Sequence, residues 1–529
     1  MSNGIPLEQA RQAYRIDLKR PLRPSAIDNQ KLLQDFHPDY ANNSHAALKV
    51  GVNCNDPCHP QLVALLQSNS ATNEAMLATA TQIESDVLVI GSGGAGCSAA
   101  LIAAENGANV LIATKLRAGD SNTVMAEGGI QASIEDNDTP QAHFDETLKA
   151  GHHCSDKRLV EQMVLDGPDV IQWLIQQGMQ FDRDGEGNLC TRRAGGTSAD
   201  RVLYYHDYTG LEMMRVLRES VRQHNRITTY DYSPAVELLS NKDGHCSGAL
   251  LYSIETQQYT IVKAKSVILA SGGLGRMHLN GFPTSNHVGA TGDGLVLAYR
   301  LGAQLQTLDS FQYHPTGLAW PQTLAGTLIT EGIRSAGAQL VNSSGKRFID
   351  ELAPRDVVSA AIMRECAEGR GIRLESGRQG VWLDIPTLEK QQPGRLAQAF
   401  PKFIALCNKA DIDPYRSPLL ICPTLHYQNG GVVINEACET TIPGLYCAGE
   451  VSGGIHGKNR IMGNALLEII SFGRRAGAAA AARHPPSDSQ LLLDHLKAFR
   501  HEIKSNHIAS NTQGPLLFPH YASFSRRGT

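Results

Sequence analysis

The hydrophobic pattern of the chain changes abruptly at Asp86. Residues 1 to about 80 are polar and irregular, with short helical pieces such as 61–66, and we interpret them as an N-terminal extension. Residues 87–90 then form a wholly apolar run rich in β-branched side chains. Such a run is typical of a strand buried on both faces of a parallel sheet.

This first run begins a predicted strand–helix–strand unit. Residues 98–105 are small and have helical periodicity, and residues 110–113 are a second apolar run. Two later apolar runs, 266–270 and 444–448, each precede glycine and are expected to be further strands of the same sheet. The pattern therefore predicts an α/β protein with a Rossmann-like nucleotide-binding sheet.

The stretch between the last two strands is long enough to be a domain of its own. It covers roughly residues 306–425 and is rich in Pro, Gly and functional side chains. The nucleotide-binding domain is therefore predicted to be discontinuous. The expected divisions are the extension at 1–80, the first part of that domain at 81–305, the insertion at 306–425, the second part at 426–485 and a C-terminal tail at 486–529.

Composition narrows the class of protein. With 48 Lys+Arg against 52 Asp+Glu, the 529-residue chain lacks the basic excess of nucleic-acid-binding proteins. Its 50 glycines exceed the average usage of about 7%, which favours close approaches of the backbone to a ligand. The 11 scattered cysteines suggest reduced thiols. No run approaches the roughly 18 apolar residues of a membrane helix, and we expect a cytoplasmic protein without membrane insertion.

A dinucleotide-binding loop directly follows the first strand. Gly91, Gly93 and Gly96 have G-x-G-x-x-G spacing, with Gly94 and Ala95 between them. This spacing lets the backbone turn sharply and approach a pyrophosphate at the N-terminus of the next helix. Strand, loop, helix and second strand occur in the order that the motif requires.

The second strand ends without the acidic residue that often binds a ribose hydroxyl. Thr114 and Lys115 occupy this position. A neutral hydroxyl can still bond to a ribose, and the motif by itself leaves the choice between nicotinamide and flavin open.

Several segments resemble the fumarate reductase/succinate dehydrogenase flavoprotein family, which includes L-aspartate oxidase. They are residues 114–115, 121–123, 126–130 and 449–450, and the likeness runs from about 85 to 477. The resemblance implies FAD as the cofactor, with its flavin ring between the FAD-binding domain and an inserted α+β capping domain. It implies a cofactor-binding set that comprises Gly91, Gly93, Gly94, Ala95, Gly96, Thr114, Lys115, Ser121, Asn122, Thr123, Gly128, Gly129, Ser271, Gly272, Asp293, Glu450, Asn464, Ala465 and Leu466.

One position departs from the respiratory members of the family. They carry a histidine that is covalently bonded to the flavin, whereas this sequence has Asn122. The resemblance therefore implies non-covalent FAD.

Four separated segments carry residues suited to anion recognition and proton movement. They are 312–317, 330–334, 354–359, and His426 together with 456–460. Each has an ordinary structural explanation when taken singly. Together they match the dicarboxylate site of the family in the order of the segments and in their local sequences.

This resemblance assigns the two ends of the substrate. His426 and Arg460 bind one carboxylate, where a planar guanidinium can hold two oxygens. His314 and Thr330 bind the other carboxylate. Such a grip orients the reacting carbons.

The resemblance also implies a reaction and its proton donor. Fumarate and succinate would be interconverted by hydride transfer from or to flavin N5, with Arg355 as the proton donor or acceptor. An ordinary arginine pKa of about 12.5 lies far from neutrality, so the residue type alone indicates an anion binder. Glu331 and Arg334, three apart on one helical face, could resupply the proton.

Two alternative functions stay open. In L-aspartate oxidases a glutamate before a Gly-Gly pair recognises the substrate ammonium, but this sequence has Ala194 there. A methyl group cannot pair with an ammonium, which favours an unaminated dicarboxylate over L-aspartate. A non-catalytic flavoprotein scaffold of a larger complex is the other alternative.

The electron donor is not defined by the sequence. The chain has no haem motif and no iron–sulfur cysteine run, so free flavin, a nicotinamide cofactor, a quinol or a partner redox protein could serve. Only about 50 residues follow Arg475, so we expect little of the helical domain that follows the FAD domain in respiratory members and L-aspartate oxidases, and no iron–sulfur protein contacts through it. Metal sites at Cys54/Cys58/His59 and at 152–154 are not expected because further ligands are lacking.

Overall fold

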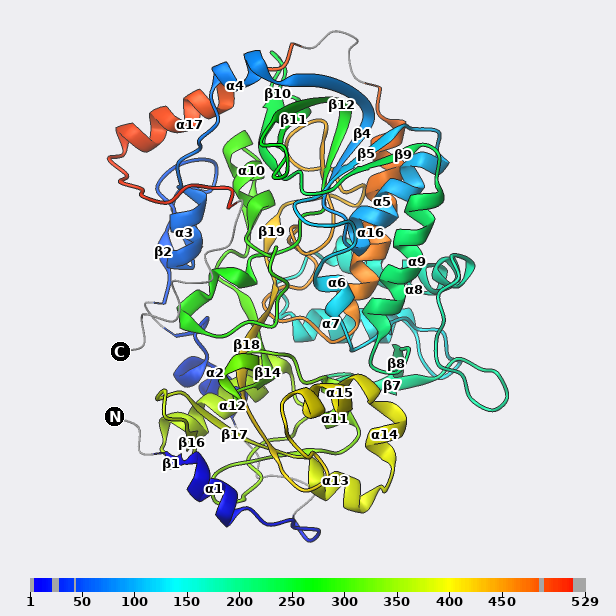
Figure 1. Cartoon of the computed structure of the whole chain (residues 1–529), viewed down its shortest axis with the longest axis vertical. Helices are drawn as coiled ribbons and strands as arrows, with labels where there is room; N and C mark the ends of the chain where they lie inside the picture. The colour runs from blue at the N-terminus through cyan, green and yellow to red at the C-terminus, as the bar shows by residue number, and fades with distance from the viewer. Residues whose placement is uncertain (1–3, 21–27, 42–43, 485–489, 517–529) are drawn as a thin grey trace.

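The computed structural model describes residues 4–20, 28–41, 44–484 and 490–516. A seven-stranded sheet forms the core of its larger half (Figure 1). The central strand β12 (Tyr259–Leu269) pairs in parallel with β4 (Thr81–Ile90) and, near its end, with β20 (Leu445–Cys447). The sheet continues through β5 (Val110–Ala113) and β9 (Ile227–Tyr230) on one side and through the antiparallel strands β11 (Cys246–Tyr252) and β10 (Ala235–Ser240) on the other. The four predicted apolar runs all lie in this sheet, and the predicted α/β class with an FAD-binding fold is confirmed.

Helices of small residues cover the sheet next to the glycine loop. Helix α5 (Gly94–Glu105) packs closely on α16 (Asn464–Ala482). The approach is close because α16 has glycine at the contact: a Cβ at Gly473 would lie 2.2 Å from Ser98 Oγ, and one at Gly477 would lie 2.2 Å from Ala99 O. Helices α8 (Lys157–Gln176) and α9 (Thr209–Gln223) pack beside this pair.

A second sheet forms the smaller half of the molecule (Figure 1). Its strands are β1 (Ile5–Pro6), β14 (Phe311–Leu318), β15 (Gln339–Val341), β16 (Ile372–Arg373), β17 (Gln379–Asp384) and β18 (Leu419–Gln428). Its helices are α11 (Glu331–Ser335), α12 (Arg355–Ala367), α13 (Ile385–Gln391), α14 (Arg395–Ala399) and α15 (Pro401–Lys409). A separate apolar cluster that includes Ile333, Val358 and Leu383 fills this half. Strand β18 crosses the predicted boundary at 425, so the boundaries 306 and 425 stay predictions.

The N-terminal extension contacts both halves. Strand β1 pairs with β16, and α2 (Asn29–Phe36) packs on α12. Farther along, α3 (Pro60–Leu66) packs on α10 (Asp293–Leu301) of the larger half. The predicted tail also contains a helix, α17 (Asp494–Ser505), which packs on α10 as well.

Shorter elements complete the described chain. They are α1 (Leu7–Ala13), β2 (Ala46–Ala47), β3 (Pro57–Cys58), α4 (Glu74–Thr79), α6 (Asn122–Met125), β6 (Ile130–Gln131), α7 (Pro140–Ala150), β7 (Thr191–Arg193), β8 (Asp200–Leu203), η1 (Gly275–Met277), η2 (Leu279–Gly281), β13 (Leu305–Gln306), η3 (Gln322–Leu324) and β19 (Gly431–Val432). No helix among the described residues combines the length and the apolar character needed to cross a bilayer.

The α5–α16 contact predicts a stability effect. Gly477→Ala should lower the free energy of unfolding by about 1–3 kcal/mol, because overpacking against Ala99 O outweighs the gain in helix propensity. Urea unfolding followed by circular dichroism measures it. Gly185→Ala, whose Cβ would meet open space, is the control and should stay within about 0.5 kcal/mol of wild type. A Gly477→Ala protein as stable as wild type would contradict the packing described.

Candidate functional site

A cavity of about 480 Å³ runs from the glycine loop into the interface between the two halves. The residues predicted to bind cofactor or substrate that line it are Gly91, Gly93, Gly94, Ala95, Thr114, Lys115, Ser121, Asn122, Thr123, Gly128, Gly129, Ser271, Gly272, Asp293, His314, Thr330, Glu331, Arg355, His426, Glu450, Arg460, Ala465 and Leu466. Three predicted residues lie outside this lining: Gly96, Arg334 and Asn464. Asn464 is fully buried and bonds instead to His143 and Thr147 on α7.

The glycine loop has a shape that only glycine allows at two positions. Gly91 has a φ of +111°, and a Cβ there would lie 2.2 Å from Ala270 O. A Cβ at Gly96 would lie 2.0 Å from Gly91 O. The loop thus leads directly from β4 into the N-terminus of α5, where free backbone N–H groups and the helix dipole favour an anion.

Two hydroxyl groups and an ion pair surround the end of β5. Ser92 Oγ donates to Thr114 Oγ1 at 3.0 Å. Lys115 Nζ lies 2.8 Å from Asp293 Oδ2 and also donates to Thr291 Oγ1. Lys115 and Asp293 are therefore paired with each other at the cavity wall.

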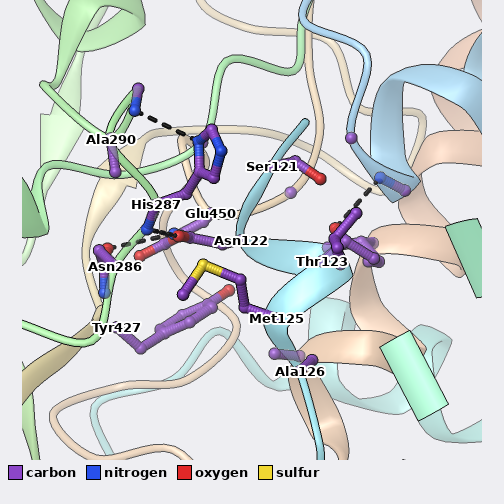
Figure 2. Close-up of a pocket in the computed structure, with 18 of the residues that line it drawn as sticks. Ser121, Asn122, Thr123, Met125, Ala126, Asn286, His287, Ala290, Tyr427 and Glu450 are labelled. Atoms are coloured by element: carbon purple, nitrogen blue, oxygen red, sulfur yellow. Dashed lines mark hydrogen bonds between the residues drawn. The ribbon is translucent and has the colours of Figure 1, made fainter. Parts of the chain in front are cut away.

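Asn122 lies at the centre of a hydrogen-bond network (Figure 2). Its Nδ2 donates to Glu450 Oε2 at 3.0 Å and to Asn286 Oδ1 at 3.1 Å, and its Oδ1 accepts from His287 N at 2.6 Å. Burial raises the pKa of Glu450, whose Oε1 also accepts from Gln428 N. The Asn122 amide has no nucleophilic ring nitrogen and is fixed by three neighbours.

These features fit an adenine dinucleotide. The glycine loop leaves no room for side chains at Gly91 and Gly96, and the N-terminus of α5 directly follows this loop. Ser271 Oγ lines the cavity, is buried and has no hydrogen-bond partner among the described residues, so a polar ligand atom can satisfy it.

The opposite end of the cavity is built around Glu331. This residue begins α11, and its Oε2 lies 2.8 Å from Arg355 Nε and 3.0 Å from Arg334 Nη2. Its Oε1 accepts from Gly195 N of the larger half at 2.9 Å. Burial alone would raise the pKa of Glu331, but the two arginines and Gly195 N–H lower it to about 2.

Gln312 connects two arginines of the site, a role that its sequence motif did not predict. Its Oε1 accepts from Arg355 Nη1 and from Arg460 Nη2, each at 2.9 Å, and its Nε2 donates to Arg460 O at 2.7 Å. Gln312 precedes His314 by two residues on the same strand, and alternate residues of a strand share a face. This spacing could have indicated that Gln312 lies in the site. One neutral side chain thus joins the two arginines predicted to hold substrate.

Two histidines lie beside these arginines. The rings of His314 on β14 and His426 on β18 are 5.0 Å apart. Burial, together with the nearby arginines, lowers the pKa of both well below the usual range, so both are neutral near pH 7. Burial and Arg355 lower the pKa of Arg460 to about 9, which leaves it charged at neutral pH.

A further ion pair closes the cavity wall between the two halves. Lys402 Nζ of α15 lies 3.0 Å from Glu127 Oε1, and both residues line the cavity. Burial raises the pKa of Glu127 to about 7, despite Lys402. Neither residue was assigned a role from the sequence.

Several known proteins resemble this chain in sequence or in fold. A family model described as an FAD binding domain matches residues 86–466. A fumarate reductase (CoM/CoB) polypeptide of Methanothermobacter marburgensis, named as one of that enzyme's subunits, is 40% identical over 75% of this chain and 72% of its own. An L-aspartate oxidase of Streptomyces coelicolor is 37% identical over 76% of this chain and 69% of its own. A solved structure of Escherichia coli quinol fumarate reductase FrdA has a TM-score of 0.73 and 31% identity, and the match covers 80% of this chain and 74% of that one.

Fold and cavity therefore define an FAD-dependent oxidoreductase, and FAD is confirmed as the cofactor. The chain belongs to the flavoprotein family that contains fumarate reductase and L-aspartate oxidase, as its motifs indicated.

The Asn122 network predicts how FAD is held. The amide of Asn122 cannot form the covalent bond to the flavin that a histidine forms in respiratory members of the family. Acid precipitation of the purified protein should therefore release all FAD into the supernatant. Absorbance of supernatant and pellet measures the distribution. Flavin that stays with the pellet after washing would contradict non-covalent binding.

The low pKa of Glu331 predicts a pH-dependent stability. Since the pKa falls from 4.5 to about 2 on folding, the charged form stabilises the protein above pH 4.5, and this contribution is lost as the pH falls toward 2. The difference in thermal unfolding midpoint between wild type and Glu331→Gln should be constant near neutral pH and should become smaller below pH 4.5. Glu375→Gln at an exposed position is the control. A gap that stays constant in acid would show that Glu331 is not held as an anion.

Proposed function

We propose that this protein interconverts fumarate and succinate. The observation that carries the proposal is an excess of buried positive charge at one end of the FAD cavity. Arg334, Arg355 and Arg460 are all buried, and Glu331 is the carboxylate that pairs with two of them. Counted over these four side chains alone, three guanidinium groups and one carboxylate leave two positive charges. A dicarboxylate dianion has the complementary charge.

The polar groups are divided so as to grip such a ligand at two ends. We assign His426 and Arg460 to one carboxylate, where Arg460 can donate to two oxygens. His314 and Thr330 are assigned to the other. Because both histidines are neutral, each has one ring N–H to donate without adding charge. Fixing both ends holds the two central carbons in one orientation.

FAD, when bound, supplies the two-electron chemistry of the reaction. The proton is assigned to Arg355. Its Nε is tied to Glu331 and its Nη1 to Gln312, while its Nη2 has no partner among the described residues. Nη2 is thus the atom that can give a proton to a substrate carbon, or take one in the reverse direction.

Glu331 and Arg334 support this proton transfer. Glu331 Oε2 contacts both arginines, so a proton can return to Arg355 through two short contacts. The low pKa of Glu331 means that it carries a proton only in passing. Burial of Arg355, Glu331 and Arg460 excludes bulk water from competing with this route.

L-aspartate oxidation is the second candidate, supported by the Streptomyces coelicolor relative. The position before the Gly-Gly pair argues against it. Ala194 is 1% exposed and packs with Ala150, Val202 and Met462, so it offers no acceptor to an ammonium group. Its neighbour Gly195 contributes a backbone N–H to Glu331 instead.

The electron partner and the cellular location stay predictions. The Methanothermobacter marburgensis relative is named as one subunit of its enzyme, which supports a partner redox protein as the electron donor. We propose a cytoplasmic location.

A steady-state assay tests the proposed reaction. Fumarate should drive anaerobic oxidation of a reduced viologen, and Arg355→Lys should lower kcat by about 10²–10⁴-fold with a small change in KM. Arg373→Gln, at an exposed position on β16, is the control and should match wild type. An enzyme that reduces unsaturated monocarboxylates as well as fumarate would refute the two-ended grip. Peroxide formation from L-aspartate and oxygen would instead support the second candidate.

A further inference from the structure

Helix α10 is enclosed by segments from opposite ends of the chain. Helix α3 packs on it, and so does α17 (Figure 1). The Arg300 side chain of α10 is fully buried and connects both segments, because its Nη2 donates to Ser68 O at 2.9 Å and its Nη1 donates to Gly514 O at 2.8 Å.

The segment after α17, residues 510–516, is fastened along the end of α3. Asn69 makes two of the contacts: its backbone N–H donates to Thr512 O at 2.9 Å, and its Nδ2 donates to Ser510 O at 2.7 Å. Gly514 N donates to Asn69 O at 3.0 Å. A regular set of hydrogen bonds therefore fixes the path of this segment.

The segment ends at the wall of the FAD cavity. Leu516 O accepts from Lys115 Nζ at 2.6 Å, and Leu516 N donates to Asp293 Oδ1 at 3.2 Å. Lys115 and Asp293 both line the cavity. Leu516 also packs against the main apolar core. The segment thus adds two hydrogen bonds to the ion pair described above.

This end of the cavity is where the adenosine part of FAD belongs. In dinucleotide-binding sheets the residue after the second strand meets the adenosine ribose. Thr114 and Lys115 directly follow β5, which is that strand. The substrate residues lie at the far end of the same cavity.

We propose that residues 510–516 form a strap that closes the adenosine end of the FAD cavity and slows release of the cofactor. The strap holds Lys115 and Asp293 through two hydrogen bonds from one residue, Leu516. If FAD leaves past these side chains, the two bonds that Leu516 makes to them must break first. Detachment of the strap also breaks the contacts with Asn69 and Arg300, so opening is cooperative and slow.

Exchange of bound FAD for excess radiolabelled FAD measures the effect. Truncation after Ala509 removes the strap and should increase the exchange rate at least tenfold. Truncation after Leu516 is the matched control, because it keeps the strap, and should stay within twofold of the full chain. Equal rates for the two truncations would overturn the proposal.

A point variant keeps the test decisive if the shorter truncation does not fold. Asn69→Ala lies outside the cavity and removes one hydrogen bond to the strap, and it should raise the exchange rate about threefold without lowering the unfolding midpoint of the FAD-free protein. Asn106→Ala, which removes a similar exposed amide contact on α5, is its control. An unchanged exchange rate in Asn69→Ala would overturn the proposal. So would an absence of exchange in every variant, since a cofactor that never leaves needs no closure.

Discussion

Burial of like charges is the constraint on which the site depends. Arg355 and Arg460 each donate to the same oxygen of Gln312, so two buried guanidinium groups are brought together around one neutral acceptor. Two positive charges that share one hydrogen-bond acceptor repel strongly where the dielectric constant is low. Glu331 offsets part of that repulsion, and an anionic ligand can offset the rest. The selectivity proposed for the site follows from this imbalance, because a neutral or singly charged acid would leave buried charge without a partner.

The same constraint explains why both halves of the molecule are needed. Arg355 and Glu331 come from the smaller half, whereas Arg460 and the Gly195 amide come from the larger half. Further contacts hold the halves together close to Arg355. The next residue, Asp356, accepts from His152 Nε2 of the larger half at 2.6 Å. The Arg355 end of the cavity is therefore complete only while the two halves are in contact.

Local sequence was sufficient to predict the framework. The strands next to Gly91 and Thr114 were predictable because hydrophobic runs and glycine spacing report backbone geometry within about 30 residues. The cavity-facing roles could be named only through resemblance to a family, since each residue alone had an ordinary explanation. Gln312 lies in the predicted segment 312–317, but its role was missed because its two partners lie 43 and 148 residues away, and no local pattern indicates such contacts. The strap was missed for the same reason, because Leu516 meets Lys115 across 401 residues. The resemblance implied a cofactor contact for Asn464, and its side chain bonds to His143 and Thr147 of α7.

A crystal structure of the FAD-loaded protein with malonate, a short dicarboxylate, tests the central claim most directly. One malonate carboxylate should lie within hydrogen-bonding distance of Arg460 and His426, and the other near His314 and Thr330, with Arg355 beside the carbon between them. Malonate bound through one carboxylate only, or Arg460 turned away from the flavin, would contradict it.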